Sequence, residues 1–197
     1  MSVHTIGRQA ALIVIDLQKG IIGFPTAHPA ADVVERAASL ARAFRRHSLP
    51  VVLVNVIGIP PGRVDRPLEL GELPVDFAEL VPELDQQAGD HLLSKRSWGA
   101  FTATGLERLL RDLGVTKVVI AGIATSAGVE TTSRQAYELG FDVVLPVDAM
   151  TDMSAHAHDN SADDVFPRIA QVCRAQDIHD LLSQSESRVL ANLEGTS

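Results

Sequence analysis

The sequence predicts an α/β protein in which helices cover both faces of one parallel sheet. Short apolar runs alternate with longer amphipathic segments, as in successive βα units joined by right-handed crossovers. The apolar runs, such as AALIVID at 10–16, are nearly continuous, which is typical of strands buried on both faces. No repeat or low-complexity linker divides the 197 residues, so we expect a single domain, 1–197, with its core at about 10–182.

The first half of the chain supplies one predicted helix and three strands. The helix at 32–47 has apolar residues at helical spacing from Val33 to Phe44. Glycine and proline mark 58–74 as a loop, and a mixed segment follows at 77–84. The strands are predicted at 10–16, 51–57 and 91–95.

The second half continues the alternation. Gly114 and Gly140 are stop signals for the two helices that precede them. Helical segments are expected at 106–113, at 126–139, from about residue 155, and at 177–182. Strands are predicted at 115–122, 141–148 and, as a short sixth strand, 169–173.

Composition and charge exclude several classes of partner. The net charge of -8 argues against nucleic acid, because the phosphate backbone would be repelled on average. No apolar run approaches the roughly 20 residues that cross a bilayer, and the first ten residues lack the features of a secretory signal. The lone cysteine allows no intramolecular disulfide. A cytoplasmic protein that acts on a small molecule, without membrane contact, is expected.

Polar residues gather where the predicted strands end. In open parallel sheets, ligands bind outside the carboxyl ends of the strands, at the point where strand order reverses. Asp16, Asn55 and Lys95 occupy such ends, and the turn after the fourth strand begins at Gly122. Asp16 is interpreted either as a carboxylate that caps the next segment or as the partner of Lys95. Lys95 is interpreted either as that partner or as an ammonium that points to solvent. If the two side chains meet, the ammonium favours an ionised Asp16 while burial opposes ionisation, which suits a group that exchanges a proton.

The segment GIATSAGVETT, at 122–132, joins a predicted strand to a predicted helix through small residues. The first amides of a helix have no intrahelical partner and can stabilise an oxyanion. Small residues let a ligand approach this backbone closely. The alternative interpretation is close packing of the helix against the strand, which Gly122 would permit.

Three blocks together resemble the isochorismatase-like hydrolase superfamily, which includes nicotinamidases, N-carbamoyl amidohydrolases and isochorismatases. The blocks are ALIVIDLQKG, SKRSWGAFTATGLERLL and VVIAGIATSAGVETTSRQAYELGFDVVLPVDAMTD, in the family's order and spacing. The resemblance covers roughly 10–182. It implies a Rossmann-like three-layer α/β/α sandwich around a six-stranded parallel sheet, and a homo-oligomer such as a dimer or tetramer.

The resemblance also implies site residues. Asp16 and Lys95 match the Asp and Lys of the family's catalytic trio, and Gly128 occupies the position of the nucleophilic cysteine. A cis peptide is implied between Ile123 and Ala124. The amides of Ala124 and Gly128 would then form the oxyanion hole.

Glycine at position 128 excludes the thioester mechanism of the amidase branches. Thr125 and Ser126 are expected to cap the helix rather than to act as nucleophiles. Cys173 lies far along the chain and is interpreted as a structural thiol. Isochorismatases likewise have glycine at the cysteine position and cleave a vinyl ether without a covalent intermediate.

No metal and no cofactor are expected. Nicotinamidases carry an Asp-x-His pair after the second strand, where this chain has Asn55, Val56 and Ile57. His156 and His158 have HxH spacing on a predicted helix, where residues two apart do not share a face, so a metal site there is disfavoured.

The sequence therefore predicts a metal-independent hydrolase that uses Asp16 and Lys95 in acid–base cleavage of a vinyl-ether-type bond. Its pocket is expected to be walled by Phe24, Asn55, Trp98 and Phe101, with a core position equally open for Phe101. One alternative is an inactive family member that binds a small ligand or a protein. A flavodoxin-like nucleotide-binding module is disfavoured, because GIATSAG is neither GxGxxG nor a P-loop.

Overall fold

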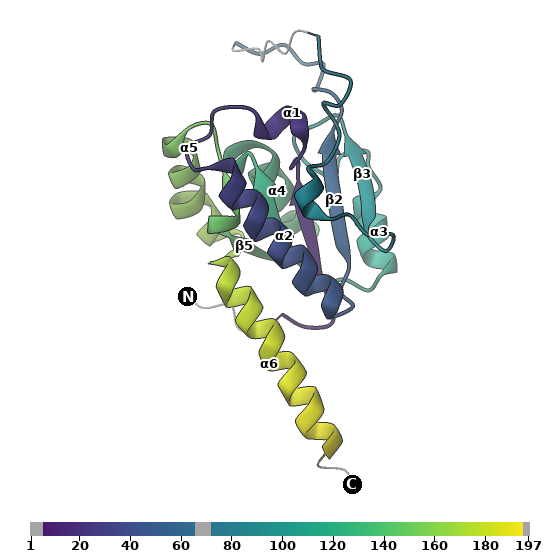
Figure 1. Cartoon of the computed structure of the whole chain (residues 1–197). Helices are drawn as coiled ribbons and strands as arrows, with labels where there is room; N and C mark the ends of the chain where they lie inside the picture. The colour runs from purple at the N-terminus through teal and green to yellow at the C-terminus, as the bar shows by residue number, and fades with distance from the viewer. Residues whose placement is uncertain (1–5, 66–71, 195–197) are drawn as a thin grey trace.

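The computed structural model describes residues 6–65 and 72–194, and these residues form one parallel sheet with helices on both faces (Figure 1). The sheet order is β3-β2-β1-β4-β5-β7, with β6 paired to β4. The strands are β1 Ala10–Ile15, β2 Val51–Val56, β3 His91–Lys95, β4 Lys117–Ile123, β5 Asp142–Pro146, β6 Met150–Thr151 and β7 Gln171–Cys173. The predicted α/β class is thereby confirmed.

The sheet has seven strands in the described part of the chain, where six were predicted. The additional strand, β6, is two residues long and pairs only with the end of β4, Gly122 opposite Met150 and Ile123 opposite Thr151. It follows a 3-10 turn at Val147–Ala149, and two residues are too few to show a strand pattern. It pairs with the first two residues of the GIATSAG segment, directly before the cis peptide that follows Ile123.

Two hydrophobic clusters fill the space between the sheet and its two helical layers. Alternate residues of β1 enter opposite clusters, with Leu12 and Val14 on the α2 side and Ile13 on the side of α3 and α4. Helices α2 and α6 cover the first face, and α3 and α4 cover the second (Figure 1). The α-helices are α1 Lys19–Ile22, α2 Ala30–Arg46, α3 Leu106–Asp112, α4 Glu130–Glu138, α5 Ala155–Asn160 and α6 Ala175–Glu194.

The last helix differs most from prediction. It was expected to end at Leu182, but α6 continues to Glu194 and projects from the body of the molecule (Figure 1). Its first turns bury Ile178 and Leu182 against the α2 layer, so the packed part corresponds to the predicted segment. In the described residues, no helix combines the length and apolar character needed to cross a membrane.

Strand order reverses between β1 and β4, which are neighbours at the centre of the sheet. The chain moves outward from β1 to β2 and β3 on one side, and from β4 to β5 and β7 on the other. A crevice at the carboxyl ends of β1 and β4 is where such a fold binds ligands. Asp16 and the GIATSAG turn both lie there.

Candidate active site

Asp16 leaves β1 in a left-handed conformation, with φ of 52°. This region of φ is uncommon for a residue with a side chain, although Asp tolerates it better than most. The Asp16 amide still donates to the carbonyl of Val54, at 2.9 Å, so the residue remains tied to β2. The carboxyl group is turned aside from the strand and is almost fully buried.

Lys95 ends β3 and reaches across the strand ends to Asp16. Its Nζ lies 2.7 Å from Asp16 Oδ2 and 3.0 Å from the carbonyl oxygen of Ser97. Both side chains are buried, with residue exposures of 3% for Lys95 and 6% for Asp16. Of the two open interpretations of these residues, the structure therefore favours a buried ion pair.

Burial and the ammonium act on Asp16 in opposite directions. Loss of water disfavours the charged carboxylate, while the charge of Lys95 and its hydrogen bond favour it. Burial prevails and raises the pKa of Asp16 to about 6. The second carboxyl oxygen, Oδ1, is buried without a hydrogen-bond partner among the described residues. Asp16 is thus equipped to hold or release a proton near neutral pH, with one oxygen uncommitted.

The turn after β4 has an unusual backbone. Gly122 has φ of 124°, and a Cβ there would collide with the carbonyl oxygen of Ile15, so only glycine fits. The peptide between Ile123 and Ala124 is cis, at the position that the sequence resemblance implied. Thr125–Val129 then forms a single π-helical turn that leads into α4.

Gly128 lies in this π-helical turn and faces Asp16. A Cβ built on Gly128 would stand 2.9 Å from Ile15 Cγ2 and 3.4 Å from Asp16 Oδ2. The turn, the carboxylate and Lys95 therefore form one cluster assembled from β1, β3 and β4. Asp16 and Lys95 were predicted from strand ends that are far apart along the chain, and Gly128 from the family resemblance.

Thr125 and Ser126 do not cap the helix with their side chains, so that expectation was wrong. Thr125 Oγ1 instead lies 2.8 Å from His158 Nδ1. Ser126 donates from both its amide and its hydroxyl to Asp152 Oδ2, each at 2.8 Å. Asp152 supplies the anion at the start of the helical turn, a role that the sequence analysis did not assign to it.

The four predicted wall residues have different environments. Phe24 is half-buried in the loop between α1 and α2. Asn55 is buried at the end of β2, where Nδ2 donates to the carbonyl of Ala78 at 2.8 Å and Oδ1 has no partner among the described residues. Trp98 is 59% exposed in the loop after β3.

Phe101 belongs to the core. Its ring lies 5.9 Å from the ring of Phe141, which directly precedes β5 at the amino edge of the sheet. It also packs against the cluster beneath α3 and α4. Of the two positions left open for Phe101, the structure favours the core position over a place in the pocket.

Gln18 is a functional neighbour that the sequence analysis missed. It is fully buried just after Asp16 and bridges two segments that lie far from it in the chain. Its Nε2 donates to the carbonyls of Val56 and Phe77, at 3.0 and 2.9 Å, and its Oε1 accepts from the Val56 amide at 2.7 Å. This side chain thereby ties the 72–81 segment to the strand ends next to the site.

Within residues 6–65 and 72–194, no group of three or more His, Cys, Asp or Glu side chains is arranged to hold a metal ion. The side chains of His156 and His158 have different environments: His156 is exposed, and His158 is buried against Thr125. Cys173 is a buried thiol at the end of β7, and burial raises its pKa to about 12. It is therefore unsuited to nucleophilic attack.

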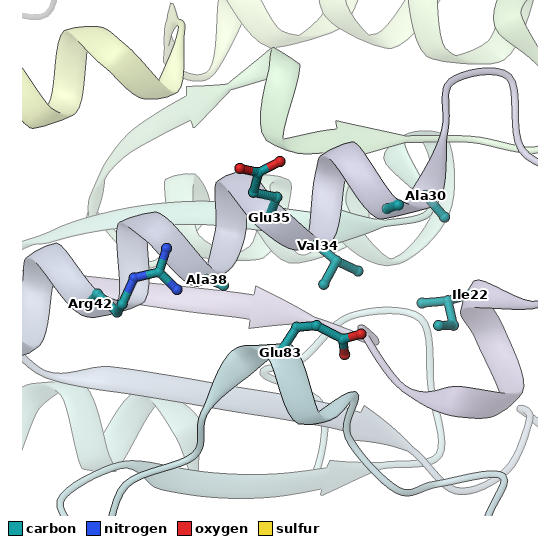
Figure 2. A pocket seen from close by; sticks show the side chains of 8 residues that line it. Ile22, Ala30, Val34, Glu35, Ala38, Arg42 and Glu83 are labelled. Carbon is teal, nitrogen blue, oxygen red and sulfur yellow. The ribbon is translucent and has the colours of Figure 1, made fainter.

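A separate pocket of about 410 Å³ lies between α2, Ile22 of α1 and Glu83 of the 3-10 turn Pro82–Leu84 (Figure 2). Val34 and Ala38 form part of its apolar lining, while Glu35, Arg42 and Glu83 bring charges to it. None of its lining residues belongs to the turn after β4 or to the ends of β1 and β3. The pocket is thus distinct from the cluster around Asp16.

Comparison with known proteins identifies the family of this chain. Residues 10–177 match the Isochorismatase domain family. The chain belongs to the isochorismatase family. The isochorismatase family protein YecD of Escherichia coli O157:H7 is 40% identical over 182 residues, covering 89% of this chain and 97% of YecD. The maleamate amidohydrolase of Pseudomonas putida KT2440 is 31% identical over 182 residues, covering 87% of this chain and 85% of that protein.

The fold of this isochorismatase-family protein also has close structural counterparts. The structure of an isochorismatase family protein from Burkholderia thailandensis superimposes with a TM-score of 0.88 at 36% identity, covering 92% of this chain and all of that one. This family membership makes the protein a hydrolase.

Proposed function

We propose that this hydrolase cleaves a vinyl-ether-type bond in a small molecule, with Asp16 as the acid, without a metal and without a covalent intermediate. The observation that carries the proposal is the buried Asp16–Lys95 pair beside Gly128. A carboxyl group with pKa of about 6 is half protonated at about pH 6 and still about one tenth protonated at pH 7, so part of the protein carries the proton that a general acid must supply. Glycine at the neighbouring position leaves no thiol to compete for the substrate.

The reaction balances with these groups alone. Asp16 transfers its proton to the terminal carbon of the enol ether, whose π electrons form the new C–H bond, and the adjacent carbon becomes an oxocarbenium ion. Water adds to that carbon and returns a proton to Asp16. The bond from this carbon to the ether oxygen then breaks: Asp16 returns its proton to the departing oxygen, which leaves as an alcohol, and takes the proton of the added hydroxyl, whose oxygen becomes that of the carbonyl product.

Lys95 and the β4–α4 turn support these steps. The ammonium of Lys95, 2.7 Å from Asp16, stabilises the carboxylate that is left after proton transfer. The amides of Ala124 and Gly128 are the proposed donors to substrate oxygens. Asn55 Oδ1, buried without a partner among the described residues, is available to accept a hydrogen bond from the substrate.

The relatives suggest two kinds of reaction, amide hydrolysis and vinyl-ether hydrolysis, that an experiment must distinguish. The maleamate amidohydrolase acts, by its name, on an amide, whereas a vinyl-ether hydrolase releases a carbonyl compound. We therefore propose to assay pyruvate release from isochorismate beside ammonia release from a panel of small amides. Pyruvate without ammonia is expected. Ammonia without pyruvate would contradict vinyl-ether cleavage, and thermal stabilisation by isochorismate without product would indicate an inactive, ligand-binding member.

A further inference from the structure

The turn that carries the proposed oxyanion amides is held from outside by the segment 151–158. Thr125, the first residue after the cis peptide unit, is fully buried with its hydroxyl oxygen 2.8 Å from His158 Nδ1. The next residue, Ser126, is bound twice by Asp152. Both side chains that follow the cis peptide unit therefore depend on one neighbouring segment for their polar contacts.

His158 is in turn supported by His28, from the loop before α2. The two imidazole rings meet edge to face, with centroids 4.7 Å apart and planes at 63°. The backbone amide of His28 donates to Thr151 Oγ1 at 3.1 Å, and its Nδ1 lies 3.1 Å from the same oxygen. A continuous set of contacts thus runs from the loop before α2, through α5, to the turn.

We propose that His158 is a positioning residue of the active site. Through the Thr125 hydroxyl it fixes the turn that presents the Ala124 and Gly128 amides, and a change in its protonation alters that turn. The role of those amides rests on the proposed function, whereas the coupling of His158 to the turn does not depend on it.

The coupling follows from hydrogen-bond direction. The buried hydroxyl hydrogen of Thr125 requires an acceptor inside the protein. Among the described residues, the polar contact of Thr125 Oγ1 is His158 Nδ1. A neutral imidazole can accept through one nitrogen, but a protonated imidazole only donates. Protonation of His158 therefore forces the Thr125 hydroxyl to reverse its role and to find another acceptor.

Burial and the neighbouring His28 favour the neutral ring of His158. Burial lowers the pKa of His158 below 6.5, and the neighbouring His28 lowers it further. Asp159 on α5, Asp152 after β6 and Asp163 on the following turn act in the opposite direction without overcoming burial. Because the folded state disfavours the charged ring, the native hydrogen bond is present at neutral pH and is lost only as the pH falls through that lowered pKa.

The test is an NMR titration of isotopically labelled protein from about pH 8 down to the acid limit of folding, because the pKa of His158 lies below the ordinary histidine value. It uses an Asp16→Asn background, because the Asp16 carboxylate lies next to Gly128 and would add its own titration to the turn. The His158 ring and the amides of Ala124 and Gly128 are followed together. We expect the chemical shifts of the two amides to change with pH at the same midpoint as the titration of the His158 ring.

Three variants on that background make the test decisive. Thr125→Val removes the hydroxyl, so the amide shifts should lose their link to His158, whereas Thr125→Ser should retain it. His156→Gln alters the exposed histidine of the same helix and should leave the titration unchanged. Amides that stay constant while His158 titrates, or that still follow it in Thr125→Val, would overturn the proposal. If Thr125→Val does not fold, His158→Asn serves in its place and should abolish the pH-dependent changes in the amide shifts. Amide shifts that still change with pH in His158→Asn would contradict the proposal.

This design separates the inference from the proposed function. The Asp16→Asn background lacks the proposed acid, so the result does not depend on which substrate is turned over. Failure to release pyruvate would leave the coupling of His158 to the turn intact. Loss of the coupling would leave the role of Asp16 intact.

Discussion

At the scale of single residues, the proposed chemistry depends on the pKa of Asp16, which burial raises and the ion pair with Lys95 lowers. Burial raises its pKa to about 6 even though Lys95 lies 2.7 Å away. The same carboxyl in water would be ionised at neutral pH and would be a poor acid. Under the proposed mechanism, the hydrophobic ends of β1 and β4 would contribute to function as well as to stability.

The pH dependence of activity should follow this pKa. A general acid acts only when protonated, so kcat/KM should be highest below about pH 6 and should fall roughly tenfold per unit above it. The measurement is initial rates across that range, with unfolding followed in parallel to exclude acid denaturation. Activity that is constant up to pH 8 or that rises with pH would argue against Asp16 as the acid.

Glycine at position 128 suits the packing of the turn as well as the proposed mechanism. A Cβ there would stand 2.9 Å from Ile15 Cγ2, inside a fully buried cluster, so Gly128→Ala should lower the free energy of unfolding by about 1–3 kcal/mol. Gly89→Ala is the matched control, since a Cβ there meets no atom within 4 Å. Denaturant unfolding of both variants provides the comparison, and equal stability would show that the turn relaxes easily.

At the scale of elements, the strand ends are held together by side chains rather than by backbone pairing alone. Gln18 makes three hydrogen bonds, to Val56 and Phe77, that fasten the 72–81 segment beside the site. These partners are separated by 38 and 59 residues from Gln18. A contact of this kind becomes visible only when the strands are aligned.

Gln18→Leu should test this fastening. The substitution removes the Gln18 partner of the part-buried Val56 amide and one of the two donors to the Phe77 carbonyl, which also accepts from the Gly20 amide. The lost hydrogen bonds should lower the free energy of unfolding by about 2 kcal/mol. Gln87→Leu removes an exposed hydrogen bond to Asp85 and should change stability by less than about 0.5 kcal/mol. Similar losses from the two substitutions, in chemical denaturation, would show that the Gln18 bonds carry little net stability.

The sequence predicted elements with strong periodicity and missed contacts that depend on packing. Strand β3 was predicted at its observed bounds, and α2 began two residues before the prediction, because their patterns are local. Asp16 and Lys95 could be found from their places at strand ends, and the cis peptide from the family resemblance. His158 against Thr125 and Asp152 against Ser126 could not, because HxH spacing and a lone Asp specify no partner before the elements pack.

At the scale of the whole molecule, α6 projects from the sheet and its helical layers (Figure 1). A helix that leaves its own domain has few intramolecular contacts to stabilise it, so packing against a second copy is a reasonable expectation. The family resemblance likewise implied a dimer or tetramer. Light scattering coupled to gel filtration should give a multiple of the monomer mass, and a monomer at micromolar concentration would contradict this expectation.

The measurement that tests the central claim most directly is pyruvate release from isochorismate by the wild type and by Asp16→Asn, side by side. The variant replaces the acid by a group of the same shape that cannot transfer a proton to carbon. Circular dichroism establishes that both proteins are folded. Pyruvate from the wild type alone is the predicted result, and equal release by a folded Asp16→Asn protein would contradict the account.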